Sequence, residues 1–256
     1  MADFALFRTR RFLPLFITQF FGAFNDNFLK QAIIILLGYR LIQNQDYLVI
    51  LTNLAMALFI LPYFIFSSPA GQLADKYDRD KLTRILKLVE ILLMVLAFAA
   101  FWLQSVPMLF VLLFFMGAQS TFFSPAKYSL LPLQLHEDEL LAGNAFIEAG
   151  TYLAILIGTI AGGLSVALPL PVPWSDWIAG GILIVLAVVG YLGSRYIPPA
   201  QPQMPELAIS YNPARETWEI LRSVYKQPVV FRCILGNSAF WRSEERRVGK
   251  ECRSRW

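Results

Sequence analysis

Apolar runs of about twenty residues follow one another along this chain, separated by short clusters of charged residues. A helix needs about twenty residues to cross the roughly 30 Å hydrocarbon core of a bilayer. The chain is 57% hydrophobic and only 16% charged, well on the apolar side of a soluble domain. The alternating ten-residue segments that are typical of membrane barrels do not occur in it. The pattern therefore predicts an all-α membrane protein.

The apolar runs predict six complete membrane spans and the beginning of a seventh. The six spans are expected at about Phe12–Gly38, Tyr47–Pro69, Thr83–Leu103, Pro107–Ala126, Leu140–Leu168 and Trp177–Ile197. Residues 1–197 should thus form a six-helix transmembrane bundle, and residues 198–226 a cytoplasmic linker that is proline-rich at first and then amphipathic. Residues 227–241 read as the start of the seventh helix.

The placement of lysine and arginine predicts the orientation, because these residues are enriched in cytoplasmic loops. Fourteen of them fall on the side of the amino terminus, with Lys87 and Lys127 counted among them, whereas the opposite side has only Arg40. Trp102 and Trp177 fall at the far interface, where aromatic belts lie. The amino terminus is therefore expected in the cytoplasm.

The last fifteen residues, RSEERRVGKECRSRW, break the apolar pattern and cut the seventh span short after Trp241. They resemble the translation of a common short-read sequencing adapter; the alternative is a solvated basic terminus at a lipid surface. Most of the net charge of +4 comes from this stretch, so the charge is no sign of a nucleic-acid partner. We expect residues 242–256 to be an artefact and the remainder to be the first half of a longer chain.

The first span carries a polar group at its middle, in the segment FFGAFNDNFLK, which contains Asn25, Asp26 and Asn27. Helical spacing places Gln19, Asp26 and Lys30 on one face. A charge near the bilayer midplane costs at least ~2.5–3.5 kcal/mol, so Asp26 should face a cavity or a partner. One interpretation is an ion pair with Lys30 that only fixes packing. We favour the other, a substrate-binding or ion-coupling site.

Two later spans add candidate residues. Glu148 in the fifth span reads as a second buried acid that forms a polar face with Asn144, with a structural link to the basic loops as the alternative. Lys127, at the end of the fourth span, is placed to meet an anionic group, although it also fits simple anchoring at the membrane surface. The sequence contains no constellation typical of a catalytic, metal or cofactor site, so none is predicted.

The loop GQLADKYDRDK between the second and third spans has a recognisable spacing. Gly71, Asp75, Lys76, Arg79 and Lys81 fit the G-x-x-x-D-K/R pattern and resemble the corresponding loop of major facilitator superfamily transporters. A glycine would let two helix ends approach, and the aspartate would pair with basic residues to latch one conformation on the cytoplasmic face. The alternative is an ordinary basic loop. Six spans and a linker also resemble the amino-terminal bundle of that superfamily.

Three segments together, QFFGAFNDN, FSPAKYSLLP and GNAFIEAGT, resemble the lysophospholipid transporters of bacterial inner membranes. This resemblance implies a secondary-type carrier that moves lysophospholipids by alternating access, without chemistry and with a carboxy-terminal half still to follow. The Asn-Asp-Asn group would meet an ammonium or hydroxyls of the lipid head, and Lys30 and Lys127 its phosphate. The alternatives are a carrier of another amphipathic or drug-like solute and the membrane domain of a bifunctional acyltransferase.

Overall fold

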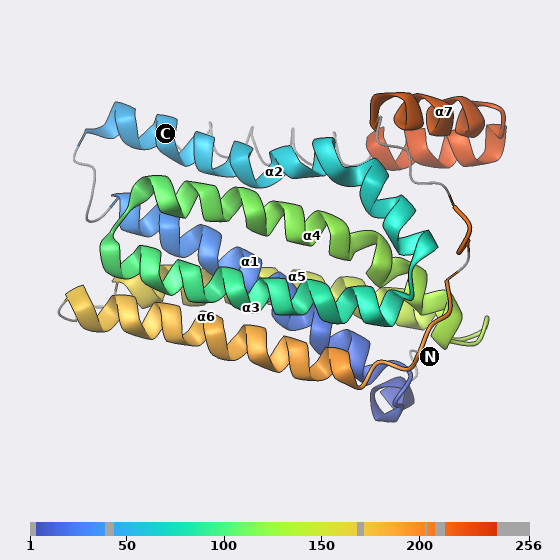
Figure 1. Cartoon of the computed structure of the whole chain (residues 1–256), viewed down its shortest axis with the longest axis horizontal. Coiled ribbons are helices and arrows are strands. Elements are labelled where there is room, and N and C mark those ends of the chain that lie inside the picture. The colour runs from blue at the N-terminus through green and yellow to red at the C-terminus, as the bar shows by residue number, and fades with distance from the viewer. Residues whose placement is uncertain (1–3, 39–43, 168–171, 203, 208–212, 240–256) are drawn as a thin grey trace. The chain divides into compact units, whose positions relative to one another are not determined.

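The structure is a computed structural model. It describes residues 4–38, 44–167, 172–202, 204–207 and 213–239. In these residues every regular element is a helix, so the all-α prediction is confirmed for the described part (Figure 1). The described residues belong to two units, residues 1–209 and 210–256. The predicted break after Trp241 and the adapter-like tail lie outside the described residues.

The first unit contains one short 3-10 helix and six long α-helices. They are η1 (Phe4–Arg8), α1 (Leu13–Leu36), α2 (Gln45–Lys76), α3 (Arg79–Leu103), α4 (Val106–Gln134), α5 (Leu140–Ala167) and α6 (Val172–Arg195). Helix α2 starts at a cap, because the Asn44 side chain accepts from the backbone N–H of Asp46 at 2.9 Å. The helices α2 and α4 run past their predicted apolar stretches, since hydropathy marks only the part of a helix that contacts lipid.

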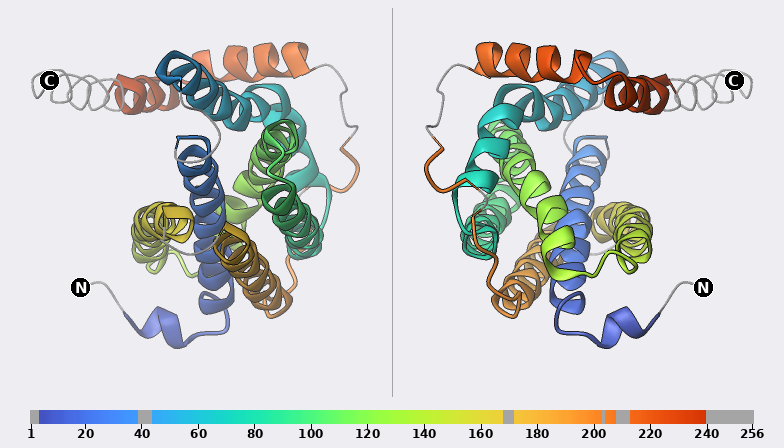
Figure 2. Two further views of the ribbon diagram at one scale, coloured as in Figure 1. Left: turned by 90° about the vertical axis from the view of Figure 1, so that its left-hand side faces the viewer. Right: turned by 90° about the vertical axis from the view of Figure 1, so that its right-hand side faces the viewer.

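Within the described residues, five helices, α2 to α6, are long and apolar enough to cross a membrane, whereas six spans were expected. Helix α1 has 24 residues, but its polar group around Asp26 lowers its mean hydropathy. It packs against α5 and α6 and also meets α2 and α4. Figure 2 shows α1 between α5 on one side and α4 and α6 on the other. A helix enclosed by protein can carry polar residues that lipid would exclude.

Small residues allow α5 to lie close to α1. Gly158 and Gly162 are buried, and a methyl group added at either would run into a backbone carbonyl of α1, at Phe24 and Phe28 respectively. Small residues that recur every four positions, a stripe that includes Gly158 and Gly162, thus form the packing face of α5.

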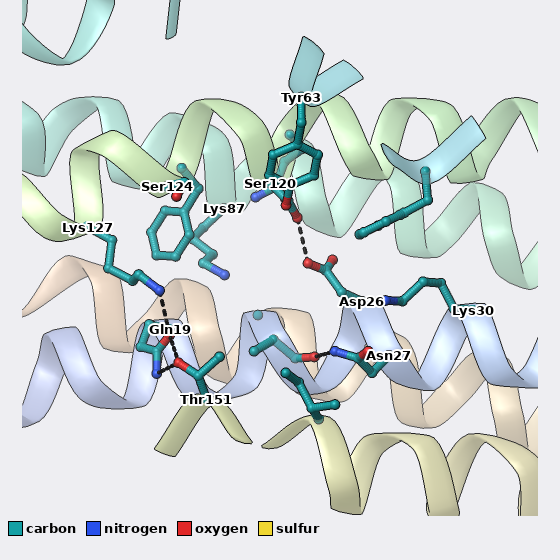
Figure 3. Close-up of a pocket in the computed structure, with 16 residues that line it drawn as sticks. Gln19, Asp26, Asn27, Lys30, Tyr63, Lys87, Ser120, Ser124, Lys127 and Thr151 are labelled. Atoms are coloured by element: carbon teal, nitrogen blue, oxygen red, sulfur yellow. Dashed lines mark hydrogen bonds between the residues drawn. The ribbon is translucent and has the colours of Figure 1, made fainter. Parts of the chain in front are cut away.

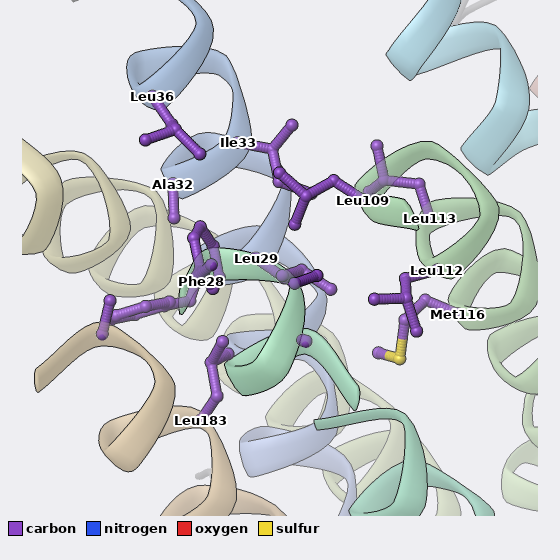
Figure 4. Close-up of a cluster of buried hydrophobic side chains, with 14 of the residues drawn as sticks. Phe28, Leu29, Ala32, Ile33, Leu36, Leu109, Leu112, Leu113, Met116 and Leu183 are labelled. Atoms are coloured by element: carbon purple, nitrogen blue, oxygen red, sulfur yellow. The ribbon is translucent and has the colours of Figure 1, made fainter. Parts of the chain in front are cut away.

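Two of the groups of buried apolar side chains in the first unit include residues of α1. The large core cluster contains Phe28, Leu29, Ile33, Leu109, Leu113, Met116 and Leu183 among others (Figure 4). The small core cluster contains Phe12, Leu15, Leu130, Leu131 and Ile147. Along α1 the small cluster precedes and the large cluster follows the polar group, so the polar residues lie between two apolar layers.

The second unit contains the helix α7 (Pro213–Tyr225) and a helical stretch at residues 228–239. Trp218, Leu221 and Tyr225 are exposed, and an ion pair of 2.9 Å joins Arg215 to Glu219. The amphipathic stretch expected near the end of the linker is therefore a helix.

Candidate functional site

A cavity of about 240 Å³ lies at the level of the polar group of α1. Side chains of α1 to α5 line it, and the charged ones are Asp26, Lys30, Lys87 and Lys127 (Figure 3). The expected face of α1 is present here, since Gln19 also lines the cavity. Phe59, Phe123 and Ile155 supply apolar wall. A wall of this composition suits a ligand that has both a charged group and hydrocarbon.

Asp26 is held by a second helix. Its Oδ2 accepts a hydrogen bond of 2.6 Å from the hydroxyl of Ser120 in α4. Lys30 lies one turn further along α1, with Nζ 4.4 Å from the centre of the Phe59 ring. In the part of the chain that the structure describes, the hydrogen-bond partner of Asp26 is thus Ser120 and not Lys30.

Lys127 is buried in the cavity wall with only 8% of its surface exposed, so the interpretation as a surface anchor is wrong for its side chain. Its Nζ donates to Oε1 of Gln19 at 3.3 Å. The amide of Gln19 in turn donates to the Ile147 carbonyl and to the Thr151 hydroxyl, each at 2.9 Å. Lys127 is therefore held between α1 and α5 at one end of the cavity.

A buried ion pair in α3 was missed by the sequence reasoning. Lys87 and Glu90 are 0% and 1% exposed, and Nζ of Lys87 lies 2.6 Å from Oε2 of Glu90. The Gln119 amide donates to the same oxygen at 3.3 Å, and the Asn25 amide donates to Oε1 at 3.1 Å. Lys87 was counted with the cytoplasmic charges because it lies near the start of the expected span Thr83–Leu103, one turn inside it. A lysine followed three residues later by a glutamate, within an apolar run, was the available signal.

The two asparagines beside Asp26 have different positions. Asn25 is fully buried away from the cavity, where its amide also donates to the Leu183 carbonyl of α6 at 3.3 Å. Asn27 lines the cavity, but its amide donates to the Ala23 carbonyl of its own helix at 2.7 Å. Neighbouring positions on a helix point about 100° apart, so the Asn-Asp-Asn group does not act as one cluster.

The prediction of a second buried acid at Glu148 is wrong, because its side chain is only partly buried and it does not line the cavity. It accepts a hydrogen bond from the Tyr128 hydroxyl. Asn144 is exposed and donates to the Leu140 carbonyl of its own helix at 2.8 Å. The residues of α5 that line the cavity are Thr151 and Ile155, which lie further along the helix than Glu148 and Asn144.

The connection between α2 and α3 contains one of the ion pairs that the predicted latch would need. Arg79 is fully buried and its Nη2 lies 3.1 Å from Oδ1 of Asp75. Lys76 ends α2, and Lys81 pairs with a neighbouring aspartate. The expected role of Gly71 is not supported, because a Cβ added there would meet no atom within 4 Å. No close helix approach depends on this glycine.

Chemically, the cavity offers fixed charges and hydrogen-bonding groups inside a largely apolar unit. Among the described residues, no group of three or more His, Cys, Asp or Glu side chains could hold a metal ion. The arrangement is suited to recognise and hold a charged amphipathic molecule.

Comparison with known families decides the wider relationship. Residues 15–242 match the family model of the Major Facilitator Superfamily. The chain belongs to this superfamily. The resemblance that was inferred from the loop GQLADKYDRDK and from the six-helix bundle is thereby confirmed.

Several curated relatives carry the name Lysophospholipid transporter LplT. The chain is 28% identical over 242 residues to Lysophospholipid transporter LplT of Serratia proteamaculans (strain 568), covering 91% of this chain and 54% of that protein. It is 26% identical over 240 residues to the LplT protein of Cronobacter sakazakii, covering 91% and 55%. The Photorhabdus laumondii protein of this name is 30% identical over 195 residues, covering 74% and 44%. The chain spans about half the length of these curated relatives.

Proposed function

We propose that the protein, in its full genomic length, moves lysophospholipids across the bacterial inner membrane by alternating access. Membership of a transporter superfamily and similarity to proteins named lysophospholipid transporter support this proposal. The first unit would supply one half of the translocation path, since transport in this architecture needs two bundles that rock about a central site.

The observation that carries the proposal is the order of charges along the cavity. Lys127 lies near Gln19 at one end, Lys30 lies at the other, and Asp26 lies between them (Figure 3). A lysophospholipid head has a phosphate, and often an ammonium or hydroxyls. Asp26 would bind the ammonium or hydroxyls and the lysines the phosphate through charge-assisted hydrogen bonds.

The apolar part of the wall would accommodate the single acyl chain. Phe59 of α2, Phe123 of α4 and Ile155 of α5 line the cavity beside the charged groups. Transfer of an intact lipid forms and breaks no covalent bond, so the protein would act as a carrier and not as an enzyme. Arg79 with Asp75 would form a latch at the cytoplasmic end, with the amino terminus in the cytoplasm.

The test is uptake of a labelled lysophosphatidylethanolamine into membrane vesicles that contain the protein in its full genomic length. A labelled monoacylglycerol with the same acyl chain, which lacks the phosphate, serves as the comparison. We expect protein-dependent uptake of the lysophospholipid and little of the monoacylglycerol. Equal uptake of both, or uptake of neither together with transport of an unrelated amphipathic cation, would contradict the proposal.

A further inference from the structure

The cavity wall contains a lysine that the proposed function has not yet used. Lys87 of α3 lines the cavity, yet its side chain is fully buried in the first unit. Its Nζ lies 4.7 Å from the centre of the Phe123 ring and 2.6 Å from Oε2 of Glu90. An ammonium has three donors, and Glu90 and the ring account for two directions. Among the described residues, Glu90 is the hydrogen-bond partner found for this ammonium.

Glu90 is fixed from three helices. Lys87 of its own helix, Gln119 of α4 and Asn25 of α1 all donate to its carboxylate, at 2.6, 3.3 and 3.1 Å. The Gln119 amide also donates to the Leu86 carbonyl at 3.3 Å. A carboxylate that accepts three bonds has a fixed orientation, and it fixes the cation bound to it.

The glycine of α1 that faces this pair makes room for the ammonium. A Cβ added at Gly22 would overlap Nζ of Lys87 and approach Oε2 of Glu90 to 3.8 Å. The nearest atoms to that position all belong to this pair, because Cε of Lys87 follows at 3.7 Å. The ammonium of Lys87 therefore occupies the space where any other residue at position 22 would place its side chain.

We propose that Lys87 binds the phosphate of the transported lipid together with Lys127, and that Glu90 is the positioning residue that holds Lys87 over Gly22. The inference rests on the proposed function and names the phosphate subsite within it. Figure 3 shows Lys87 on the same side of Asp26 as Lys127, whereas Lys30 lies on the other side.

The chemistry of this end favours an anion that carries several acceptor oxygens. Two cations reach it from α3 and α4, and Ser124 and Thr151 also line the cavity there. Lysines bind phosphate as point charges, and two of them together can contact separate oxygens. Asp26 lies further along the cavity, so the ammonium of a zwitterionic head would extend toward it.

The test is ligand binding to the purified chain in detergent, with lysophosphatidylethanolamine and the matching monoacylglycerol as the two ligands. The readout is the ratio of the two dissociation constants, which reports recognition of the phosphate apart from that of the acyl chain.

Two variants change the subsite in different ways. Gly22→Ala displaces the Lys87 ammonium and keeps every charge, and Lys87→Gln with Glu90→Gln removes the ion pair without leaving a buried charge unpaired. Gly181→Ala, where a Cβ would meet nothing within 4 Å, is the matched control.

We expect both subsite variants to weaken lysophospholipid binding by roughly 10- to 100-fold, the size of effect of losing a hydrogen bond to a charged group. Monoacylglycerol binding should not change, and Gly181→Ala should behave as the unchanged protein.

A ratio that stays at the wild-type value in both subsite variants would overturn the assignment of Lys87 while leaving the proposed function in place. A wild-type protein that does not prefer the phosphate-bearing ligand would overturn both. Binding of inorganic phosphate but not of the lysolipid would assign the site to a free anion and overturn the lipid assignment.

Discussion

At the residue scale, the buried charges of the first unit are held by groups from other helices. Asp26 receives a hydrogen bond from Ser120, Lys127 donates to Gln19, and Glu90 receives one from Asn25. A buried charge without such partners would cost several kcal/mol. These bonds therefore join α1, α3 and α4 to one another around the cavity, so the same contacts that shape the site also contribute to the packing of the helices.

The ion pair of α3 gives a prediction about stability. Glu90→Ala should lower the free energy of unfolding by about 3–5 kcal/mol, because it leaves the buried ammonium of Lys87 without its counter-charge. Lys87→Gln combined with Glu90→Gln should cost much less, since no charge is then left unpaired. Thermal unfolding of the purified chain in detergent measures both. Equal losses in the single and the double variant would show that the pair does not act as a unit.

Helical spacing was enough to predict that Gln19, Asp26 and Lys30 share a face, because all three lie on one helix. It could not identify Lys87 and Glu90 as part of the same site, since their place depends on which face α3 turns toward α1. The same limit explains the error at Glu148. Ile155, seven residues later on nearly the same face of α5, lines the cavity, but how far the cavity extends along α5 could not be inferred from the spacing.

At the scale of elements, glycines of α5 allow a close contact between α5 and α1. The Cβ of an alanine at position 158 would lie 2.6 Å from the carbonyl oxygen of Phe24. Backbone atoms cannot move aside as the end of a flexible side chain can, so the two helices would have to separate. The stripe of small residues was visible in the sequence, although the partner helix was not.

Gly158→Ala should therefore destabilise the protein by about 1–3 kcal/mol, despite the better helix propensity of alanine. Gly163→Ala in the same helix is the control, because its Cβ would meet its nearest neighbour, Cγ of Gln31, at an ordinary 3.5 Å. Thermal unfolding should show a loss for the first variant and no loss for the second. A loss of equal size at both positions would contradict the account of this interface.

The connection between α4 and α5 is held by Glu139, which lies outside the membrane-spanning helices. The backbone N–H of His136 donates to its carboxylate at 3.0 Å, and the Arg11 guanidinium contacts both of its oxygens at 3.2 Å. These contacts, with the backbone hydrogen bond as the main cause, hold the pKa of Glu139 below its usual 4.5. The stabilisation is present above the pKa of the unfolded chain and is lost as pH falls through the lowered folded value.

We expect the stabilising effect of Glu139 to disappear in acid. The wild type should unfold at a higher temperature than Glu139→Gln at neutral pH, and this difference should shrink between about pH 5 and pH 3. Thermal unfolding of the two proteins across this range tests the prediction. A difference that stays constant down to the acid end would show that the carboxylate charge contributes nothing.

At the scale of the whole molecule, the polar cavity lies between two apolar clusters of the first unit. The rings of Trp102, at the end of α3, and Trp177, near the start of α6, are 5.5 Å apart, so the two residues lie at the same level, as an aromatic belt requires. Which end faces the cytoplasm follows only from the distribution of lysine and arginine, and it stays a prediction.

Cysteine labelling tests this orientation. Both native cysteines are first replaced, by Cys233→Ser and Cys252→Ser. Asp46→Cys and Asp78→Cys are then introduced one at a time, so each variant carries one thiol, near one or the other end of α2. An impermeant reagent should label position 46 in intact cells and position 78 only in inverted vesicles. Labelling of both positions from one side would overturn the predicted topology.

The central claim, that Asp26 binds the transported lipid, is tested most directly by lysophospholipid uptake in vesicles, normalised to the amount of protein in the membrane. Asp26→Asn keeps the size of the side chain and removes its charge. It should reduce uptake by roughly 10-fold or more, since a neutral amide cannot replace a charge-assisted contact. Combining it with Lys30→Gln should not restore uptake, because the hydrogen-bond partner of Asp26 is Ser120. Wild-type uptake by the double variant would instead show that Asp26 serves only to neutralise Lys30.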